Sequence, residues 1–148
     1  VSLSECRELA AEKRSDGSAL EKLAEMVELQ GGDPSYILEP SKFASAPYSK
    51  AVTARESGYI SHMDTEAVGL ACIALGAGRQ RKDDIIDPAA GIVLHKKTGD
   101  NVEAGETVAT LFASDKNLFA EAAEHLRAAL NYSAAAPAQK AVVIDTVE

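Results

Sequence analysis

Six charged side chains lie close together near the middle of the 148-residue chain: Arg79, Arg81, Lys82, Asp83, Asp84 and Asp87. Clustered cations can bind the phosphate backbone of a nucleic acid, and two carboxylates that flank a sugar can hydrolyse a glycosidic bond. These acids fall within one short turn instead of on two walls of a cleft, and acids beside cations are typical of a solvated loop. We therefore expect a surface loop, in which Asp87-Pro88 forms a turn before a strand.

The glycine-rich run Gly76-Ala77-Gly78-Arg79 invites comparison with a phosphate-binding loop. Such a loop stands between a strand and the start of a helix, where backbone N–H groups and the helix dipole converge on the anion. Here the glycines follow a predicted helix, Ala67–Leu75. They are better explained as the stop signal of that helix.

Lys116 is another candidate, because Gly91–Lys116 reads as two strands around a Gly-Asp turn and ends in Ser-Asp-Lys. Lipoyl and biotinyl domains present their modified lysine in a similar setting. A swinging-arm lysine needs the tip of a tight hairpin with a second strand leading away from it. From Asn117 onward the apolar residues repeat at helical spacing, which argues against modification.

A metal site is not expected, and no cofactor is predicted. The three histidines, His62, His95 and His125, are scattered, without a second ligand at useful spacing. Cys6 and Cys72 are too few and too far apart for a zinc site. Both cysteines lie on apolar faces of helical patterns, which fits a reducing, cytosolic setting.

The composition excludes some classes of partner. Hydrophobic residues make up 46% of the chain, as in ordinary globular proteins, and the formal net charge is -8 at pH 7. This acidity argues against nucleic-acid or anionic-membrane binding. No leader-like or membrane-spanning apolar run is present, so a cytoplasmic location is expected. Because the first residue is Val1 and not Met, we expect a processed or excised piece.

Two helices are predicted at the start of the chain. The first begins at a cap on Ser2 or Ser4 and stops before Gly17. Ser18 caps the second helix, with Glu21 three residues later as in a capping box. Two short helices cannot bury their apolar faces against each other alone, so they require a larger partner.

Three prolines make Gly31–Pro47 an irregular connector. Alternating residues then predict strands over Tyr48–Arg55 and Gly58–Met63. Asp64-Thr65-Glu66 caps the apolar helix Ala67–Leu75, which should be buried on more than one side at the centre of the core.

The remaining predicted elements are an extended piece from Ile85, strands Ile92–Leu94 and Thr107–Phe112, and turns Thr98–Asn101 and Glu103–Glu106 between them. They continue with an amphipathic helix Asn117–Tyr132 capped by Asp115, a link Ser133–Ala138 and a last strand Ala141–Ile144.

The order of these motifs resembles one known family. Residues 58–113 contain in sequence a helix, GAGR, IDPAAGI, a hydrophobic strand, KKTGD, VEAG and a second strand. This order is similar to that of the C-terminal domain of pyrimidine-nucleoside phosphorylases, which include the thymidine phosphorylases. Upstream, LEKLAEMVELQGGDP at Leu20–Pro34 resembles the family's EXMVXXQGGDP stretch, where X is variable.

The resemblance implies an α+β fold with a C-terminal domain of the α/β-hammerhead type. Its strand-turn-strand unit is related to the barrel-sandwich fold of lipoyl and biotinyl domains. On this basis residues 1–46 are a helical remnant of the family's central α/β domain with a connector, and residues 47–148 are the C-terminal domain.

The family cleaves pyrimidine nucleosides with inorganic phosphate, releasing the base and a pentose 1-phosphate. The residues that bind phosphate and pyrimidine lie upstream in the family, and no position here matches their motifs. The resemblance therefore implies a structural, cleft-supporting chain with no catalytic or substrate-binding residues. It also implies a homodimeric parent enzyme whose catalytic part is the partner of this chain.

Within that reading, Arg79, Arg81 and Lys82 are candidates for a contact with the missing domain across the substrate cleft. Two alternatives from other classes stay open. One is a carrier domain modified on Lys116. The other is an independent assembly module that binds a partner through exposed helix faces.

Overall fold

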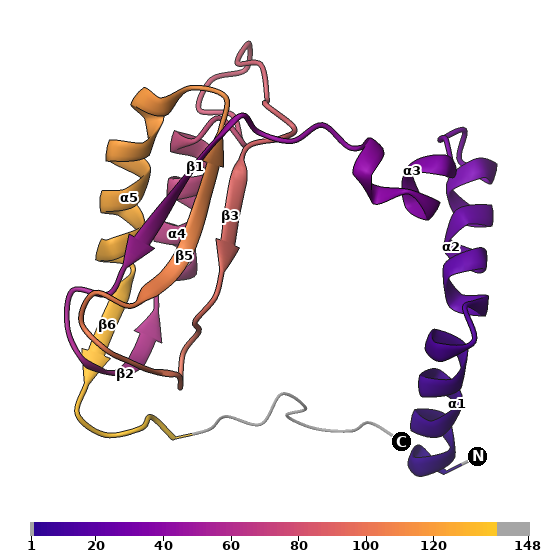
Figure 1. Ribbon diagram of the computed structural model, residues 1–148, viewed down its shortest axis with the longest axis horizontal. Helices are drawn as coiled ribbons and strands as arrows, with labels where there is room; N and C mark the ends of the chain where they lie inside the picture. Colours follow the sequence, from indigo (N-terminus) through magenta and orange to yellow (C-terminus); the bar gives the residue numbers. More distant parts are fainter. Residues whose placement is uncertain (1, 139–148) are drawn as a thin grey trace. The chain divides into compact units, whose positions relative to one another are not determined.

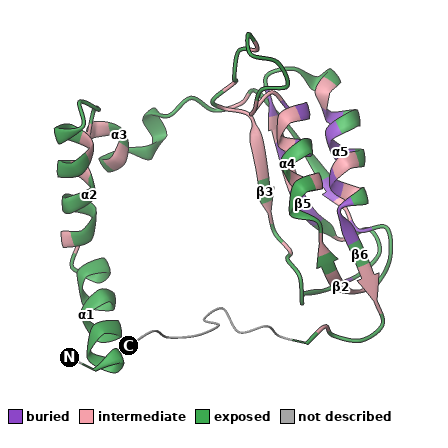
Figure 2. Cartoon of the chain, turned by 180° about the vertical axis from the view of Figure 1, so that it is seen from behind, coloured by how far each residue is buried: buried purple, intermediate pink, exposed green. Residues whose placement is uncertain are grey.

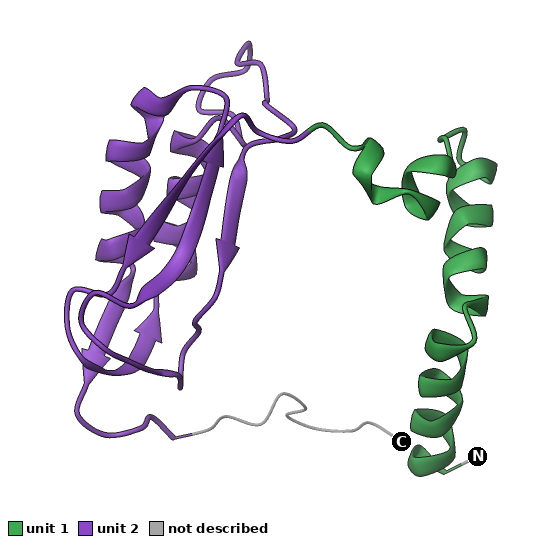
Figure 3. Cartoon of the chain, viewed as in Figure 1, with its two compact units in different colours: residues 1–44 green, residues 45–148 purple. Residues whose placement is uncertain are grey.

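The computed structural model of the protein describes residues 2–138 (Figure 1). The chain divides into two compact units, with the division between Ala44 and Ser45 (Figure 3). The first unit is helical and the second combines strands with helices, so the chain belongs to the α+β class, as the sequence predicts.

The first unit contains α1 (Leu3–Ser15), α2 (Ser18–Leu29), a one-turn helix α3 (Ser35–Leu38) and a 3₁₀ turn η1 (Pro40–Lys42). Ser2 caps α1 through a capping box, since its hydroxyl accepts the Glu5 N–H at 3.3 Å and the Glu5 carboxylate accepts the Ser2 N–H at 2.6 Å. The predicted start of the first helix is therefore confirmed.

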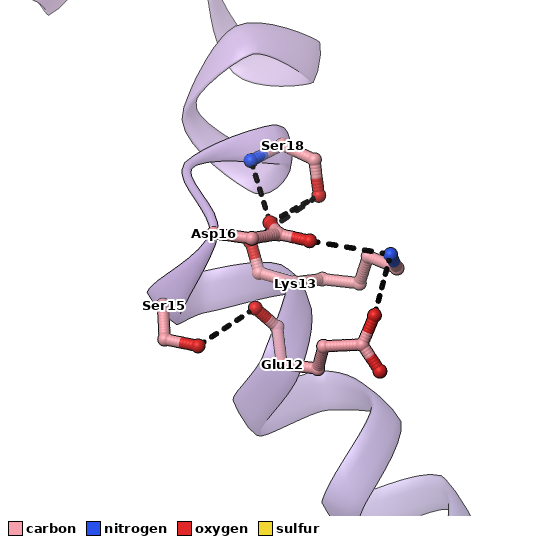
Figure 4. Close-up of polar contacts among 5 residues, drawn as sticks. All are labelled: Glu12, Lys13, Ser15, Asp16 and Ser18. Carbon is pink, nitrogen blue, oxygen red and sulfur yellow. Dashed lines mark hydrogen bonds and ion pairs between the residues drawn. The ribbon is translucent and has the colours of Figure 1, made fainter.

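The junction between α1 and α2 is held by Asp16 (Figure 4). Its carboxylate accepts the Ser18 N–H at 2.8 Å and the Ser18 hydroxyl at 2.6 Å, and these bonds lower the pKa of Asp16. The predicted capping box of Ser18 and Glu21 is wrong, because Gly17 occupies the cap position at φ 86° and Ser18 is the first helical residue. The Glu21 N–H, which a cap at Ser18 would have accepted, donates instead to the Gly17 carbonyl at 3.1 Å.

The connector is more regular than its prolines predict, because it contains α3 and η1. Asp33 accepts the Ser35 N–H at 2.8 Å, and the rings of Tyr36 and Phe43 meet edge to face at 5.2 Å between centroids. No described residue of this unit is buried. Its leucines therefore lie on helix faces that the unit itself does not cover.

The second unit contains two antiparallel sheets of three strands each. One has the order β1 (Tyr48–Thr53), β5 (Thr107–Ala113), β3 (Gly91–Leu94), and the other has the order β4 (Asn101–Val102), β2 (Gly58–Met63), β6 (Leu130–Ser133). Strands β2, β3 and β5 match the predicted ranges within one residue, and β1 ends two residues early.

The Gly-Asp turn does not close a tight hairpin between β3 and β5. These strands pair directly, with Gly91 opposite Phe112 and Leu94 opposite Ala109. The chain between them contributes strand β4 to the other sheet, where β4 pairs with β2. The Gly99 N–H donates to the Ile60 carbonyl, and the Ile60 N–H donates to the Asp100 carbonyl, both at 2.9 Å. The turn therefore leads into β4 beside β2.

The helices of this unit are α4 (Thr65–Ala74), the 3₁₀ turn η2 (Lys116–Leu118) and α5 (Phe119–Ala128). Asp64 caps α4, as predicted. Asp115, predicted to cap the amphipathic helix, caps the short turn η2 that precedes α5. The prediction that one helix continues to Tyr132 is wrong, because the chain turns after Ala129 and β6 pairs with β2. Pairing with a distant strand overrides the helical spacing of these residues.

The core lies between the helices and the β1-β5-β3 sheet, where α5 packs against β1 and β5 while α4 packs along α5 (Figures 1 and 2). Its largest fully buried side chains are Ile60, Leu75, Leu111, Leu126, Val52, Val102 and Val108. In the apolar helix predicted at Ala67–Leu75, Ala71, Ala74 and Leu75 are buried, whereas Leu70 is 46% exposed. The predicted strand Ala141–Ile144 lies outside the described residues.

Candidate functional site

Residues 76–90, which follow α4, contain the charged cluster singled out in the sequence. The segment opens with a Schellman motif: the Gly76 N–H donates to the Ile73 carbonyl at 2.9 Å and the Ala77 N–H to the Cys72 carbonyl at 3.0 Å. Gly76 has φ 90°, which a glycine adopts without strain. The helix-stop interpretation of GAGR is confirmed. The first two N–H groups of this segment are already used by the helix and are not free to bind a phosphate.

Asp84 organises the turn that carries the cations. Its Oδ2 atom accepts the Gln80 N–H at 2.9 Å and the Arg81 N–H at 2.8 Å. Farther along, the Asp87 N–H donates to the Gly76 carbonyl at 2.9 Å and closes the loop at its base. The segment is thus a hydrogen-bonded surface loop, as predicted.

The three basic side chains of the loop, Arg79, Arg81 and Lys82, are all exposed. None of them forms an ion pair with another residue in the part of the chain that the structure describes. Their positive charges are therefore available to a binding partner of the loop.

The acids of the loop do not form a catalytic pair. Asp87 accepts the Ala89 N–H at 2.9 Å, and hydrogen bonds from Ser114 and then Ala89 lower the pKa of Asp87. A general acid needs a raised pKa, so this environment is the opposite of what glycosidic hydrolysis requires. Asp84 is committed to backbone N–H groups, and Asp83 is exposed.

A shallow pocket of about 340 Å³ lies between the end of α4, this loop and the start of α5. It is lined by Ile73, Ala74, Gly76, Gly78, Gln80, Asp84, Ile85, Leu118 and Glu121. Both charged residues of this lining, Asp84 and Glu121, are carboxylates, so the pocket would repel a phosphate dianion. It is not the cradle that phosphorolysis needs.

Lys116 does not have the setting of a swinging-arm lysine. It is the first residue of η2, and α5 follows at once. A carrier lysine requires the tip of a hairpin between two strands, whereas here one strand, β5, ends before the lysine and a helix begins after it.

The histidines and cysteines are as dispersed in space as in sequence. His62 and His95 are exposed, and the His95 Nε2 lies 2.8 Å from the Thr110 hydroxyl. His125 lies 3.7 Å from the Glu121 carboxylate on α5. Among residues 2–138 no group of three potential ligands is arranged to hold a metal ion.

Cys6 lies in α1, as its helical pattern predicts, and is exposed because nothing in the first unit buries that helix. Cys72 is half-buried, and burial raises the pKa of its thiol. A reactive thiolate requires a lowered pKa, so Cys72 does not have the setting of one.

Sequence reasoning missed two features of this region. Ile85, expected to begin an extended piece, is 93% exposed in the loop. Leu118 at the end of η2 and Glu121 on α5 line the pocket although they are distant in sequence from the loop. A β-branched apolar residue between acids carries no local signal of exposure, and only the packing of α4 along α5 brings Leu118 and Glu121 to the pocket.

Comparison with known proteins decides the family. Residues 59–133 match the family model described as the pyrimidine nucleoside phosphorylase C-terminal domain. The chain belongs to the pyrimidine-nucleoside phosphorylase family. The matched range runs from β2 through β6 and includes the whole loop after α4.

Several similar proteins are named pyrimidine-nucleoside phosphorylases. The pyrimidine-nucleoside phosphorylase of Bacillus subtilis (strain 168) is 44% identical over 116 residues, which are 78% of this chain and 27% of that protein. The enzyme of Geobacillus stearothermophilus is 42% identical over 113 residues, 76% of this chain and 26% of the relative. That of Staphylococcus epidermidis (strain ATCC 12228) is 40% identical over 118 residues, 80% and 27% of the two chains.

The chain thus spans about a quarter of the length of the phosphorylases that it matches. None of the helices among the described residues has the length and apolar character needed to cross a membrane.

Proposed function

We propose that this chain is the C-terminal part of an enzyme that cleaves pyrimidine nucleosides with phosphate, giving the base and a pentose 1-phosphate. The observation that carries the proposal is the match of residues 59–133 to the family's C-terminal domain, together with 40–44% identity to proteins named for this activity. Phosphate acts as second substrate and no cofactor takes part.

The role of the chain itself is structural, and catalysis belongs to the part of the phosphorylase outside it. Two observations support this assignment. The Gly76 and Ala77 N–H groups are occupied by helix carbonyls, and the neighbouring pocket presents Asp84 and Glu121 without a cation. Phosphorolysis needs a cradle for a phosphate dianion and groups that stabilise charge on the departing base.

Within the parent enzyme, residues 1–46 belong to the central α/β domain, and residues 47–148 form a hammerhead-type domain with a strand-turn-strand unit related to lipoyl and biotinyl domains. The parent is a cytoplasmic homodimer that acts on uridine, thymidine or deoxyuridine. The helices of the first unit support this division, because none of their described residues is buried and they have no core of their own.

Phosphate-dependent release of uracil from uridine and of thymine from thymidine tests the proposal. The 148-residue chain should show no release, while the Bacillus subtilis phosphorylase serves as positive control and a longer polypeptide that includes the upstream part should be active. Activity of the chain alone, at the intact mass of 148 residues, would overturn the assignment of catalysis to absent sequence.

Arg79, Arg81 and Lys82 contact the catalytic part of the parent across its substrate cleft. Their exposure and their lack of ion pairs among the described residues support this role. Reversing all three charges in the longer polypeptide should lower kcat/KM by at least about tenfold, because a misplaced domain misaligns the reactants. Lys97→Glu in the same background is the matched control, since Lys97 is also exposed, and should leave kcat/KM unchanged. If the triple reversal and Lys97→Glu have the same kcat/KM, the proposed contact is excluded.

A further inference from the structure

Asp84 holds the backbone of Arg81 at both its N–H and its carbonyl group. The Asp84 Oδ2 atom accepts the Arg81 N–H at 2.8 Å, and the Asp84 N–H donates to the Arg81 carbonyl at 3.2 Å. The same Oδ2 atom accepts the Gln80 N–H at 2.9 Å. The two bonds to the carboxylate are of the stronger, charge-assisted kind. Together these bonds fix the backbone of two consecutive residues.

The three cations of the loop belong to this fixed stretch or flank it directly. Arg81 is held itself, Arg79 precedes Gln80, and Lys82 follows Arg81. Among the described residues Asp84 forms no ion pair with any of the three, although they are its neighbours in sequence. The carboxylate therefore fixes the backbone and leaves the guanidinium and ammonium groups to a binding partner.

Both ends of the loop are attached to the end of α4. At its start, Gly78 lies so close to Ile73 that an added Cβ atom would be 2.8 Å from the Ile73 Cγ1 atom. At its far end, the Asp87 N–H donates to the Gly76 carbonyl at 2.9 Å. Since the ends are attached, the conformation of the stretch between them depends on the bonds that Asp84 makes.

A fixed loop has an advantage over a mobile one in binding a partner. Residues of a mobile loop must become ordered when the partner binds, and the lost conformational freedom weakens the interaction. A loop that already has its bound conformation avoids this cost and presents its charges in one arrangement. In an enzyme, small displacements of such a contact misalign the reactants.

We propose that Asp84 is a positioning residue of the parent phosphorylase, holding Arg79, Arg81 and Lys82 in the arrangement in which they contact the catalytic part. This role rests on the proposed function, which assigns that contact to the three cations. Asp84 acts through the backbone of its neighbours and touches no reacting group. Because one oxygen, Oδ2, accepts both N–H groups, the role requires an acceptor atom at that place and not a negative charge.

Steady-state phosphorolysis of uridine by the longer polypeptide tests this role. Asp84→Ala removes the acceptor and should lower kcat/KM at least about threefold, because the cations then have the required arrangement for only part of the time. Asp84→Asn removes the charge but keeps a carbonyl oxygen that can accept both N–H groups, so its kcat/KM should stay within about twofold of the wild type. Asp84→Glu keeps the charge, moves both oxygens by one methylene, and should resemble Asp84→Ala.

Asp83→Ala is the matched control for the lost charge, since Asp83 is the exposed neighbour, and it should leave kcat/KM unchanged. A loss in Asp84→Asn as large as that in Asp84→Ala would mean that the charge matters and not the acceptor. That result would overturn the proposal, as would unchanged kinetics in Asp84→Ala. If Asp84→Ala does not fold, Asp84→Glu takes its place in every measurement.

A double-mutant cycle separates positioning from general destabilisation. Its background carries Arg79→Gln, Arg81→Gln and Lys82→Gln, which remove the three charges without reversing them. In this background Asp84→Ala should change kcat/KM by less than about 1.5-fold, because the groups that it positions are gone. An equal loss in both backgrounds would show that Asp84 only stabilises the fold, which overturns the proposal.

Hydrogen exchange of residues 76–90 in the 148-residue chain tests the role of Asp84 in the loop without any activity. Exchange should be at least about fivefold faster in Asp84→Ala than in the wild type or Asp84→Asn, and unchanged exchange would overturn the proposal. An inactive wild-type longer polypeptide would overturn the proposed function and this role with it. An active one whose kcat/KM does not depend on Asp84 would overturn this role alone.

Discussion

The side-chain nitrogen of Lys116 lies 4.5 Å from the centre of the Tyr48 ring. Lys116 begins η2 and Tyr48 begins β1, so the contact joins residues that are distant in the chain. A cation above an aromatic face is attracted by the ring quadrupole, by about 0.5–1 kcal/mol at an exposed site. This geometry ties the amine to the fold, whereas a carrier arm must project freely from a hairpin tip.

We therefore predict that Lys116 is not modified. After co-expression with biotin and lipoate ligases, the intact mass should remain that of the unmodified chain, while an authentic carrier domain in the same cells gains its cofactor. A fixed mass increment that disappears in Lys116→Arg would contradict this prediction. Lys116→Met should reduce the free energy of unfolding by about 0.5–1 kcal/mol, and by nothing further when Tyr48 is already Leu.

The second prediction concerns the location of the core. Leu111 on β5 is fully buried, so Leu111→Ala should reduce the free energy of unfolding by about 2–5 kcal/mol. Leu29→Ala removes the same atoms from a side chain that is 80% exposed and should change it by no more than about 0.5 kcal/mol. Urea unfolding of both variants, followed by circular dichroism, measures the difference. Equal losses would mean that the first unit contributes to the core.

Elements whose signal is local were predictable from the sequence. β2 has the predicted ends, Gly58 and Met63, because alternation and the following Asp64 cap are both local signals. The helix stop at Gly76 was equally readable, since few residues other than glycine adopt its positive φ.

Elements fixed by distant pairing were not predictable. Leu130 continues the helical spacing of Ala122 and Leu126, so the pattern favoured a longer helix. In the structure β6 pairs with β2, with Met63 opposite Leu130, and this pairing makes Leu130 part of a strand instead of the helix. β4 has only two residues, and its pairing with β2 leaves no periodicity to detect.

The charged loop was predictable in kind but not in detail. Cations followed directly by acids indicate a solvated loop, which the exposure of Arg79 and Lys82 confirms. Composition cannot tell which acid binds the backbone, since Asp83 and Asp84 are neighbours with the same side chain. Only the turn geometry directs Asp84 to the Gln80 N–H.

The third prediction uses Gly58, where a side chain cannot fit. Gly58 has φ 142°, and a Cβ atom there would lie 2.6 Å from the Ser133 carbonyl oxygen on β6. Gly58→Ala should therefore cost at least about 2 kcal/mol of unfolding free energy, because a backbone atom must move. Gly91→Ala is the control, since its Cβ would meet nothing within 4 Å. Similar melting temperatures for the two variants would refute this prediction.

The fourth prediction is a pH dependence from the Lys96–Glu106 ion pair, in which Nζ and Oε1 are 2.6 Å apart. The hydrogen bond from Lys96 and the Glu103 N–H lower the pKa of Glu106. A carboxyl whose pKa is lower in the folded state stabilises the fold above its unfolded pKa of about 4.3. This stabilisation is lost as the pH falls through that value to the lower, folded pKa.

Glu106→Gln should therefore reduce stability at neutral pH and flatten its decline in acid. Urea unfolding at pH 7, 5 and 3 measures the effect, and Glu103→Gln is the control because Glu103 is an exposed neighbour without an ion pair among the described residues. An acid profile of Glu106→Gln that runs parallel to that of the wild type would show that the pair is not formed in solution.

The last prediction concerns the loop that presents Arg79, Arg81 and Lys82. Because Asp84 accepts two backbone N–H groups of this loop, Asp84→Ala leaves both donors without their charged acceptor. Losing such bonds should lower the free energy of local opening by about 1–2 kcal/mol, which raises the cleavage rate about 5- to 30-fold. Limited trypsin digestion followed by mass spectrometry measures cleavage after each basic residue.

Cleavage of a free peptide with the sequence of residues 76–90, with and without the substitution, corrects for the effect of Asp84 on trypsin itself. After this correction the remaining increase belongs to the folded loop, and Asp83→Ala, which removes an exposed acid, should show none. If the corrected rates of both variants equal that of the wild type, the loop already opens freely. The preorganised presentation of its cations would then no longer support an interdomain contact.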